Sequence, residues 1–172
     1  TQIENLVNEF SDFARMPKPL LKKNNLNNVI KENISLISKL DKNIKIKLIN
    51  HLSKEVLISF DLEQMNRLFF NLIKNSLESI QEKSKKDSKI DKNIDIEIRQ
   101  RRDYININII DTGVGFKNKT TKELIKPYFT TKEKGTGLGL SIVDKIISDH
   151  NGSIQFLNHK KGAKIQIILP NK

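Results

Sequence analysis

Isoleucine alternates with polar residues in short segments of this chain, and this two-residue period is the feature that most restricts its fold. The clearest cases are residues 94–98 and 105–109, where every second residue is isoleucine. Successive side chains of a strand point to opposite faces of a sheet, so the alternation predicts strands with one buried face. The polar residues 101–103 between them predict a hairpin turn. Further strands are expected at 44–48, 56–60, 153–158 and 163–169.

Between these strands, apolar side chains recur with the spacing of a helix. The helices predicted in this way cover residues 3–15, 25–39, about 62–83 and 140–149. Asp61 is expected to cap the third helix, and Gln64 three residues later makes the pattern close to a capping box. Asn151-Gly152 is expected to end the fourth helix with a left-handed turn.

Most predicted strands follow one another as hairpins, and the helices fall between the hairpins. This order predicts an α/β fold, a two-layer sandwich in which helices cover one face of a mixed, mostly antiparallel sheet. The strand at 56–60 would pair weakly with the strand at 44–48. Residues 84–93 predict an exposed loop, and residues 111–138 show no clear periodic element. So long an irregular stretch inside a compact domain usually has a function.

Composition excludes several kinds of site. The chain has no cysteine, so it has no disulfide, thiolate zinc site or cysteine nucleophile. Lys and Arg number 31 against 20 Asp and Glu, a balance that fits either an acidic partner such as nucleic acid or a generally lysine-rich composition. The lysines are spread along the chain and aromatic residues make up 6%, and both facts favour the second interpretation. No apolar run approaches the length of a membrane-spanning helix.

Asn71 and Asn75 form the first motif that suggests chemistry. Four residues apart on a predicted helix, their side chains project from the same side, at the edge of its buried face. Amide oxygens suit a hard cation such as Mg²⁺, which prefers oxygen ligands. Taken alone, the pair is better explained as part of an ordinary helix in an asparagine-rich chain.

The second motif is Asp111-Thr112-Gly113-Val114-Gly115, which follows a predicted strand directly. A carboxylate at a strand end can accept a hydrogen bond from an exocyclic amino group such as that of adenine. Gly113 and Gly115 would let the backbone turn tightly and approach a flat ligand. A simple turn is an equally good interpretation of this motif by itself.

The third motif comprises Gly135, Thr136, Gly137, Leu138 and Gly139, immediately before the last predicted helix. Backbone N–H groups of a glycine-rich loop that opens a helix can bind phosphate. The spacing is neither that of a dinucleotide-binding fingerprint nor that of a P-loop. A flexible linker is the alternative, although a linker would not normally keep leucine at alternate positions.

A short aromatic segment lies between the second and third motifs. Tyr128 and Phe129 stand there, with Thr131, Lys132 and Lys134 close behind them. An aromatic ring in a polar loop would pin the loop to the body of the protein, and a lysine there could reach phosphate oxygens. For either lysine singly, simple solvation is the better interpretation.

The order and spacing of these motifs resemble the N, G1, F and G2 boxes of sensor histidine kinases. Their ATP-binding fold, called the GHKL or Bergerat fold, is shared with gyrase, Hsp90 and MutL. The resemblance covers about residue 25 to the end, and the run 129–143 is more similar to histidine kinases than to the other ATPases. Residues 6–17 resemble the end of the second dimerisation helix in nitrogen-regulation sensors of the NtrY type. The resemblance implies that residues 1–19 are the end of that helix plus a linker, and that 20–172 are an ATP-binding catalytic domain.

The resemblance also implies roles for single residues. Asn75 would coordinate the Mg²⁺ that bridges the ATP phosphates, with Asn71 in support, and both would count as catalytic. Asp111 would read the adenine amino group, and Gly113 and Gly115 would shape the adenine pocket. Residues 116–138 would form a mobile lid anchored by Phe129. The residues expected around the phosphates are Thr131, Lys132, Gly135, Thr136, Gly137, Leu138 and Gly139.

The activity implied is transfer of the ATP γ-phosphoryl group to a histidine on a dimerisation domain, for relay to a response regulator. The full-length protein would be a homodimer anchored in the inner membrane, with this segment in the cytoplasm and no nucleic-acid partner. Two rival functions remain: another GHKL-type ATPase or a serine kinase, and a basic nucleic-acid-binding module.

Two departures from the family pattern stand out. The phosphoacceptor box of the family fits none of His51, His150 and His159, so the acceptor is expected before residue 1. Many relatives carry threonine after the glycine of the final hairpin, whereas Gly162 is followed here by Ala163. A hydroxyl near the adenine would therefore be missing.

Overall fold

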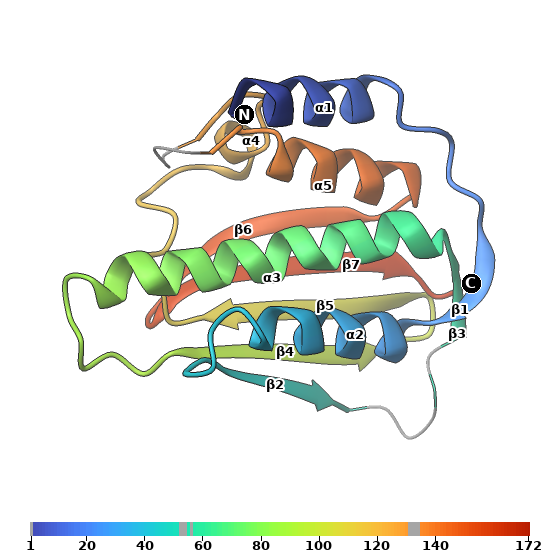
Figure 1. Cartoon of the computed structure of the whole chain (residues 1–172). Helices are drawn as coiled ribbons and strands as arrows, with labels where there is room; N and C mark the ends of the chain where they lie inside the picture. Colours follow the sequence, from blue (N-terminus) through green and yellow to red (C-terminus); the bar gives the residue numbers. More distant parts are fainter. Residues whose placement is uncertain (1, 52–54, 56, 131–134) are drawn as a thin grey trace.

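The computed structural model describes residues 2–51, 55, 57–130 and 135–172, and it is a two-layer arrangement of helices on a sheet (Figure 1). Thr131, Lys132 and Lys134, which were selected from the sequence, lie outside these residues. The helices are α1 (Gln2–Ala14), α2 (Leu26–Ser38), α3 (Leu62–Ser84), α4 (Thr121–Leu124) and α5 (Gly139–Asp149). The strands are β1 (Lys22–Asn25), β2 (Lys45–Asn50), β3 (Leu57–Phe60), β4 (Asn93–Gln100), β5 (Tyr104–Asp111), β6 (Ser153–His159) and β7 (Gly162–Pro170).

The main sheet has five strands in the order β2-β4-β5-β7-β6. Strand β2 runs parallel to β4, and the other neighbouring strands are antiparallel. The predicted mixed, mostly antiparallel sheet is thus confirmed. The two hairpins, β4-β5 and β6-β7, meet through the pairing of β5 with β7.

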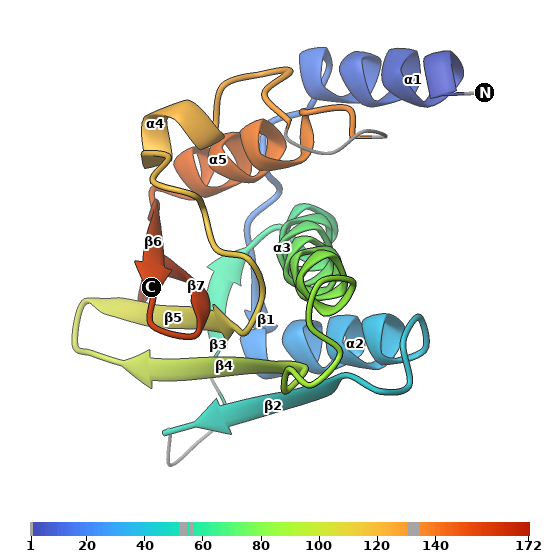
Figure 2. The same cartoon turned by 90° about the vertical axis from the view of Figure 1, so that its left-hand side faces the viewer.

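Helices α2, α3 and α5 lie on one face of this sheet (Figures 1 and 2). The alternating isoleucines point toward them, since Ile94, Ile96, Ile105, Ile107 and Ile109 are completely buried. The apolar stripes of the helices close the core from the other side. The two-layer packing predicted from the periods of the apolar residues is therefore observed.

Strand pairing outside the main sheet differs from the prediction. Strand β3 pairs with β1 and not with β2, so the expected pairing of 56–60 with 44–48 is wrong. Strand β1 has the sequence Lys-Lys-Asn-Asn and carries no apolar alternation by which it could be recognised. The short helix α4, inside the stretch predicted to be irregular, was also missed. Its capping box joins Thr120 and Glu123.

Asp61 caps α3 as predicted, because its side chain accepts a hydrogen bond from the backbone N–H of Gln64 at 3.0 Å. The capping box, however, is not completed. The side-chain amide of Gln64 donates to the carbonyl of Pro17 at 2.9 Å, and the backbone N–H of Asp61 donates to Nε2 of His150 at 3.0 Å. At the far end of α5, Asn151 has φ of 55°, which confirms the left-handed stop.

Within the described ranges, none of the helices combines the length and the apolar character that crossing a bilayer would require.

Candidate functional site

A cavity of about 1190 Å³ lies between α3, the end of β5 and the segment that leads into α5. It brings together most of the residues that sequence reasoning selected. Those that line it are Asn71, Asn75, Asp111, Gly115, Phe129, Gly135, Thr136, Gly137 and Gly139. Gly113 and Leu138 lie next to lining residues without lining the cavity themselves. The volume exceeds that of most small-ligand pockets.

Asp111 stands at the buried end of the cavity. It continues the two-residue period of Ile105, Ile107 and Ile109, so its side chain points to the helix-covered face of the sheet. Only 2% of the residue is exposed. Its Oδ1 accepts hydrogen bonds from the backbone N–H of Gly113 at 2.9 Å and of Ala163 at 3.3 Å. Neither bond uses Oδ2.

The protonation of Asp111 reflects this burial. Removal from water raises the pKa of the carboxyl group, because the charged form loses its hydration. The N–H groups of Gly113 and Ala163, the Ser76 hydroxyl and the charge of Lys83 oppose the shift without cancelling it. Ser76 Oγ is buried and, among the described residues, has no hydrogen-bond partner of regular geometry. A buried acid with so few donors can accept a further one from a ligand.

The first glycine after Asp111 is required by packing. A methyl group at Gly113 would lie 2.2 Å from Oγ of Ser79 on α3, so only glycine lets the backbone pass so close to the helix. The next residue, Val114, donates its N–H to the same Oγ at 3.0 Å. The backbone is thereby held against α3 at the wall of the cavity.

The two asparagines of α3 line the same cavity as the start of α5. Asn71 and Asn75 are one turn apart on α3, and both are half-buried. A methyl group at Gly139, the first residue of α5, would lie 3.9 Å from Oδ1 of Asn71. The cavity is therefore lined by two amide side chains and by a helix N-terminus. The amide oxygens could bind a cation, and the N–H groups of the helix could donate to an anion.

The N-terminus of α5 presents backbone donors toward this space. No described side chain caps the helix at Leu138, and the first N–H groups of a helix lack partners within it. The helix dipole adds a partial positive charge there. An anion such as a phosphate group is the ligand that this arrangement suits.

The glycine-rich loop is built onto the aromatic segment before it. Gly137 has φ of +72°, and a methyl group there would lie 2.4 Å from the carbonyl carbon of Tyr128. Phe129 packs against the hydrophobic core, and Nζ of Lys119 lies 5.8 Å from the centre of its ring. Of the two aromatic residues predicted to pin the loop to the body, Phe129 does so, whereas Tyr128 is 55% exposed and stacks on Phe10.

Two residues that do not line the cavity lie close to Asp111, and neither was predicted from the sequence to do so. A methyl group at Gly162 would lie 2.5 Å from the carbonyl oxygen of Asp111, so the β6-β7 turn is pressed against that strand end. Nζ of Lys83 donates to the carbonyls of Thr112 and Lys161, each at 3.0 Å. No sequence signal marks Lys83, since one lysine in a lysine-rich helix end is ordinary.

Mg²⁺ fits the donor set at the α3–α5 end. The described residues contain no group of three or more His, Cys, Asp or Glu side chains that could hold a metal ion by themselves. The two amide oxygens there are instead the kind of sparse set that suits Mg²⁺, which keeps waters and is shared with ligand phosphates.

Comparison with protein families gives one clear match. Residues 60–172 match the family described as histidine kinase-, DNA gyrase B-, and HSP90-like ATPase. The matched range includes nearly all of the cavity lining.

Curated relatives match nearly the whole chain. The nitrogen regulation protein NtrY of Azorhizobium caulinodans is 32% identical over 97% of the chain, and a putative sensor histidine kinase, NtrY-like, of Rickettsia felis is 34% identical over 96%. The chain spans 22% and 26% of the length of these two relatives, about a quarter.

Solved structures show the same fold. The catalytic domain of histidine kinase ThkA has a TM-score of 0.75 at 24% identity, covering 88% of this chain and 97% of that domain. Full-length ShkA in complex with AMPPNP has a TM-score of 0.80 at 18% identity, covering 96% of this chain and 35% of that one.

Proposed function

The chain belongs to the family of histidine kinase-, DNA gyrase B-, and HSP90-like ATPases, and from this premise we propose that its cavity binds ATP with Mg²⁺ for phosphoryl transfer to a histidine. One observation carries the proposal. A buried carboxylate, Asp111, lies beside Ser76 of α3, while Asn71 and the N-terminus of α5 meet at an earlier turn of that helix, with Asn75 between them, and one cavity is lined by all three side chains and by Gly139. A nucleotide has a matching polarity, with a base bearing an amino group at one end and phosphates at the other.

At the base end, Asp111 would accept a hydrogen bond from the adenine amino group. Its Oδ1 is already held by two backbone N–H groups, so Oδ2 is the oxygen that we assign to the base. Gly113 and Gly115 would keep this wall flat enough for the ring to lie against it.

At the phosphate end, backbone N–H groups of residues 135–139 would donate to the phosphate oxygens, with Thr131, Lys132 and Thr136 nearby. Asn75 would ligate Mg²⁺ through its amide oxygen, and Asn71 would support the ion or the phosphates. Bound Mg²⁺ would supply neutralisation of phosphate charge. Phosphoryl transfer depends mostly on such positioning and neutralisation, which this chain's donors provide.

We extend the proposal to the organisation of the protein. Residues 1–19 would be the end of a dimerisation helix with its linker, and residues 20–172 the catalytic domain. The acceptor histidine would lie on the dimerisation domain of the same protein, which would be a homodimer and pass the phosphoryl group to a response regulator. This segment would lie on the cytoplasmic side of the membrane. The similarity to NtrY-like sensors supports this arrangement.

Phosphorylation in trans tests the proposal. The chain is mixed with a separately produced dimerisation domain of its full-length protein and with ATP labelled at the γ-phosphate. We expect label on that domain that is lost in acid and kept in base, as phosphohistidine is, and about 100-fold less label with Asn75→Ala. Nucleotide binding without any transfer would contradict the kinase assignment.

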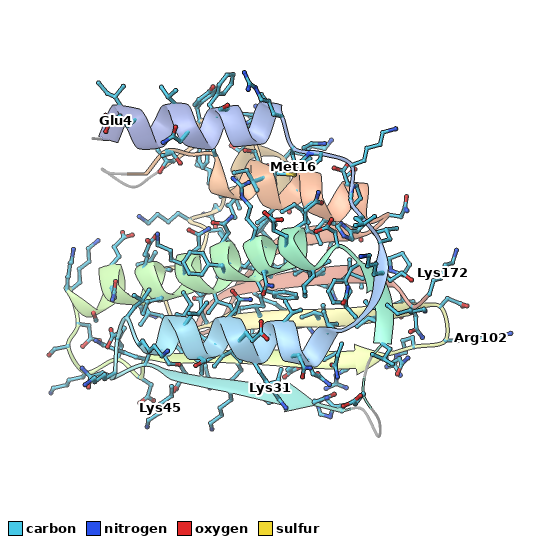
Figure 3. The ribbon with its side chains drawn as sticks, turned by 45° about the vertical axis from the view of Figure 1, so that its right-hand side comes forward. Glu4, Met16, Lys31, Lys45, Arg102 and Lys172 are labelled. Atoms are coloured by element: carbon cyan, nitrogen blue, oxygen red, sulfur yellow. The ribbon has the colours of Figure 1, made fainter. Side chains whose placement is uncertain are left out.

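Two rival functions make different predictions. A hydrolysing ATPase or a serine kinase of this family would show steady ATP turnover by the chain alone, or acid-stable phosphate on its target. A nucleic-acid-binding module would need a concentrated basic surface. Figure 3 shows Arg102 and Lys172 near each other at one edge of the molecule, whereas Lys31 and Lys45 lie on α2 and β2, so these four cations form no single patch, which favours the kinase.

A further inference from the structure

Lys83, in the last turn of α3, connects the two segments that surround Asp111. Its Nζ lies 3.0 Å from the carbonyl oxygen of Thr112, the residue that follows Asp111. The same Nζ lies 3.0 Å from the carbonyl oxygen of Lys161, in the turn between β6 and β7. One ammonium group therefore ties the end of β5 to this turn and both of them to α3.

The position of the Asp111 carboxylate depends on that turn. Ala163, two residues after Lys161, donates its backbone N–H to Oδ1 of Asp111. Gly162 touches the backbone on both sides of the motif, because a methyl group there would lie 2.5 Å from the carbonyl oxygen of Asp111 and 2.7 Å from the nitrogen of Gly113. If the turn moved away, Asp111 would lose the hydrogen bond from Ala163 and the packing of Gly162 against its backbone.

Lys83 also acts on the charge of this carboxylate. Burial raises the pKa of Asp111, and the positive charge of Lys83 acts in the opposite direction. The other groups that contact the carboxylate are the neutral donors of Gly113, Ala163 and Ser76. Lys83 is thus the charged side chain that favours the ionised, hydrogen-bond-accepting form.

On the basis of the proposed function, we propose that Lys83 is a positioning residue that holds Asp111 in place to read the 6-amino group of the purine, and so sets the preference for adenine. A lysine that only fastened two loops together would change stability but would affect the binding of all purine nucleotides alike. The two roles can therefore be separated by a probe that differs at position 6 of the base.

The experiment compares calorimetric binding of Mg-ATP with that of Mg-ITP, which carries an oxo group in place of the amino group. The variants are Lys83→Met, which keeps the length of the chain but removes its donors, and Lys83→Arg, which can still donate to two carbonyls. Lys86→Met is the matched control, since Lys86 is exposed at the same helix end. Asp111→Asn is measured alongside them.

We expect Lys83→Met to weaken ATP binding about tenfold and to leave ITP binding nearly unchanged, as loss of one good hydrogen bond to a charged group would do. Lys83→Arg should restore most of the preference, and Lys86→Met should match the parent. Equal effects of Lys83→Met on both nucleotides, or none on either, would overturn the role of Lys83 while ATP binding that depends on Asp111 still stood. A folded parent that binds neither nucleotide would overturn the proposed function and this inference together.

Discussion

Asp111 is held in a place that costs the folded protein stability. Its carboxylate is almost completely buried, and the pKa is raised because burial outweighs the donors around it. Asp111→Asn keeps the shape and the oxygen that accepts from Gly113 and Ala163, but removes the buried charge. We therefore expect the nucleotide-free variant to unfold at higher urea concentration than the parent at neutral pH, while its ATP affinity falls at least tenfold. Lower stability together with intact ATP binding would contradict the assignment.

The same residue predicts a pH dependence with a definite sign. When the folded pKa of an acid lies above its unfolded value, the folded state holds the proton more tightly, so stability falls as pH rises through the interval between the two. For Asp111 this interval begins at the usual value of 3.8 and extends upward. The gain in unfolding free energy of Asp111→Asn over the parent should therefore be absent below that pH interval, grow across it and stay constant above it. Urea unfolding at a series of pH values measures this difference.

Two glycines of the same loop should respond in opposite ways to alanine. At Gly137 a methyl group would meet the backbone of Tyr128 and φ is +72°, so Gly137→Ala should reduce ATP affinity about tenfold or more. At Gly139, the first residue of α5, the methyl group would make only ordinary contact with Asn71, so Gly139→Ala should keep affinity and gain up to about 1 kcal/mol of stability through the lower entropy of the unfolded chain. Calorimetry and thermal unfolding of both variants provide the check. Equal losses of ATP affinity in Gly137→Ala and Gly139→Ala would show that the backbone conformation at Gly137 does not determine ATP binding.

At the scale of elements, Asp61 joins three segments that are far apart in the sequence. Its carboxylate accepts from the backbone N–H of Gln64 in α3 and from that of Leu20 in the linker, the latter at 2.8 Å. Its own N–H donates to His150 at the end of α5, whose Nδ1 lies 2.7 Å from the carbonyl of Ile146. The linker, α3 and α5 are therefore fastened at one point, opposite the end of α5 that lines the cavity.

Substitution of Asp61 should show what this junction contributes. Asp61→Ala removes the helix cap and should cost about 1–2 kcal/mol of unfolding free energy, whereas Asp61→Asn keeps an acceptor and should cost less. Burial raises the pKa of Asp61, but the donors of Gln64 and Leu20 and the nearby His150 outweigh it, and the pKa is lowered. The stabilisation is then present above the usual pKa and lost as pH falls through the lowered value. Urea unfolding that shows equal stability of all three proteins at neutral pH would contradict this.

Sequence reasoning succeeded where a local pattern controls the structure. The alternating isoleucines of β4 and β5 and the apolar stripe of α3 each bury one face, so their periods were visible without a structure. Strand β1 carries no such pattern, and its pairing with β3 is set by tertiary contacts. The capping box of α4 encloses only four helical residues, too few for a period to show.

The residues of the candidate site also fall into those that a sequence pattern could predict and those that only the folded structure reveals. Asn71, Asp111 and the glycines could be selected because the order and spacing of their motifs resemble those of a known family. Lys83 could not, because its role depends on two carbonyls that are 49 residues apart in the chain, at Thr112 and Lys161, and that meet only in the folded molecule. Gly162 was noticed as a departure from a pattern, while its close approach to Asp111 was visible only in the structure.

At the scale of the whole molecule, α1 contacts a segment next to the cavity but does not line the cavity itself. The ring of Phe10 stacks on that of Tyr128, with centroids 6.3 Å apart, and the cavity-lining residues all lie from residue 41 onward. Removal of residues 1–16 keeps Pro17 and Leu20, which bond α3 and its cap. We expect the shortened chain to fold and to bind ATP within about fivefold of the parent, since one aromatic pair is worth about 1 kcal/mol. Calorimetry that shows a tenfold or larger loss would make α1 part of the site.

The central claim is that one cavity holds both the base and the Mg²⁺-bound phosphates of ATP, and a calorimetric titration tests it most directly. ATP is titrated into the parent, Asp111→Asn and Asn75→Ala, each with and without Mg²⁺. We predict that the parent binds ATP more tightly with Mg²⁺, that Asp111→Asn binds weakly in both conditions, and that Asn75→Ala loses the difference between them. A folded parent that binds no nucleotide, or an Asn75→Ala variant with an unchanged Mg²⁺ effect, would contradict the account.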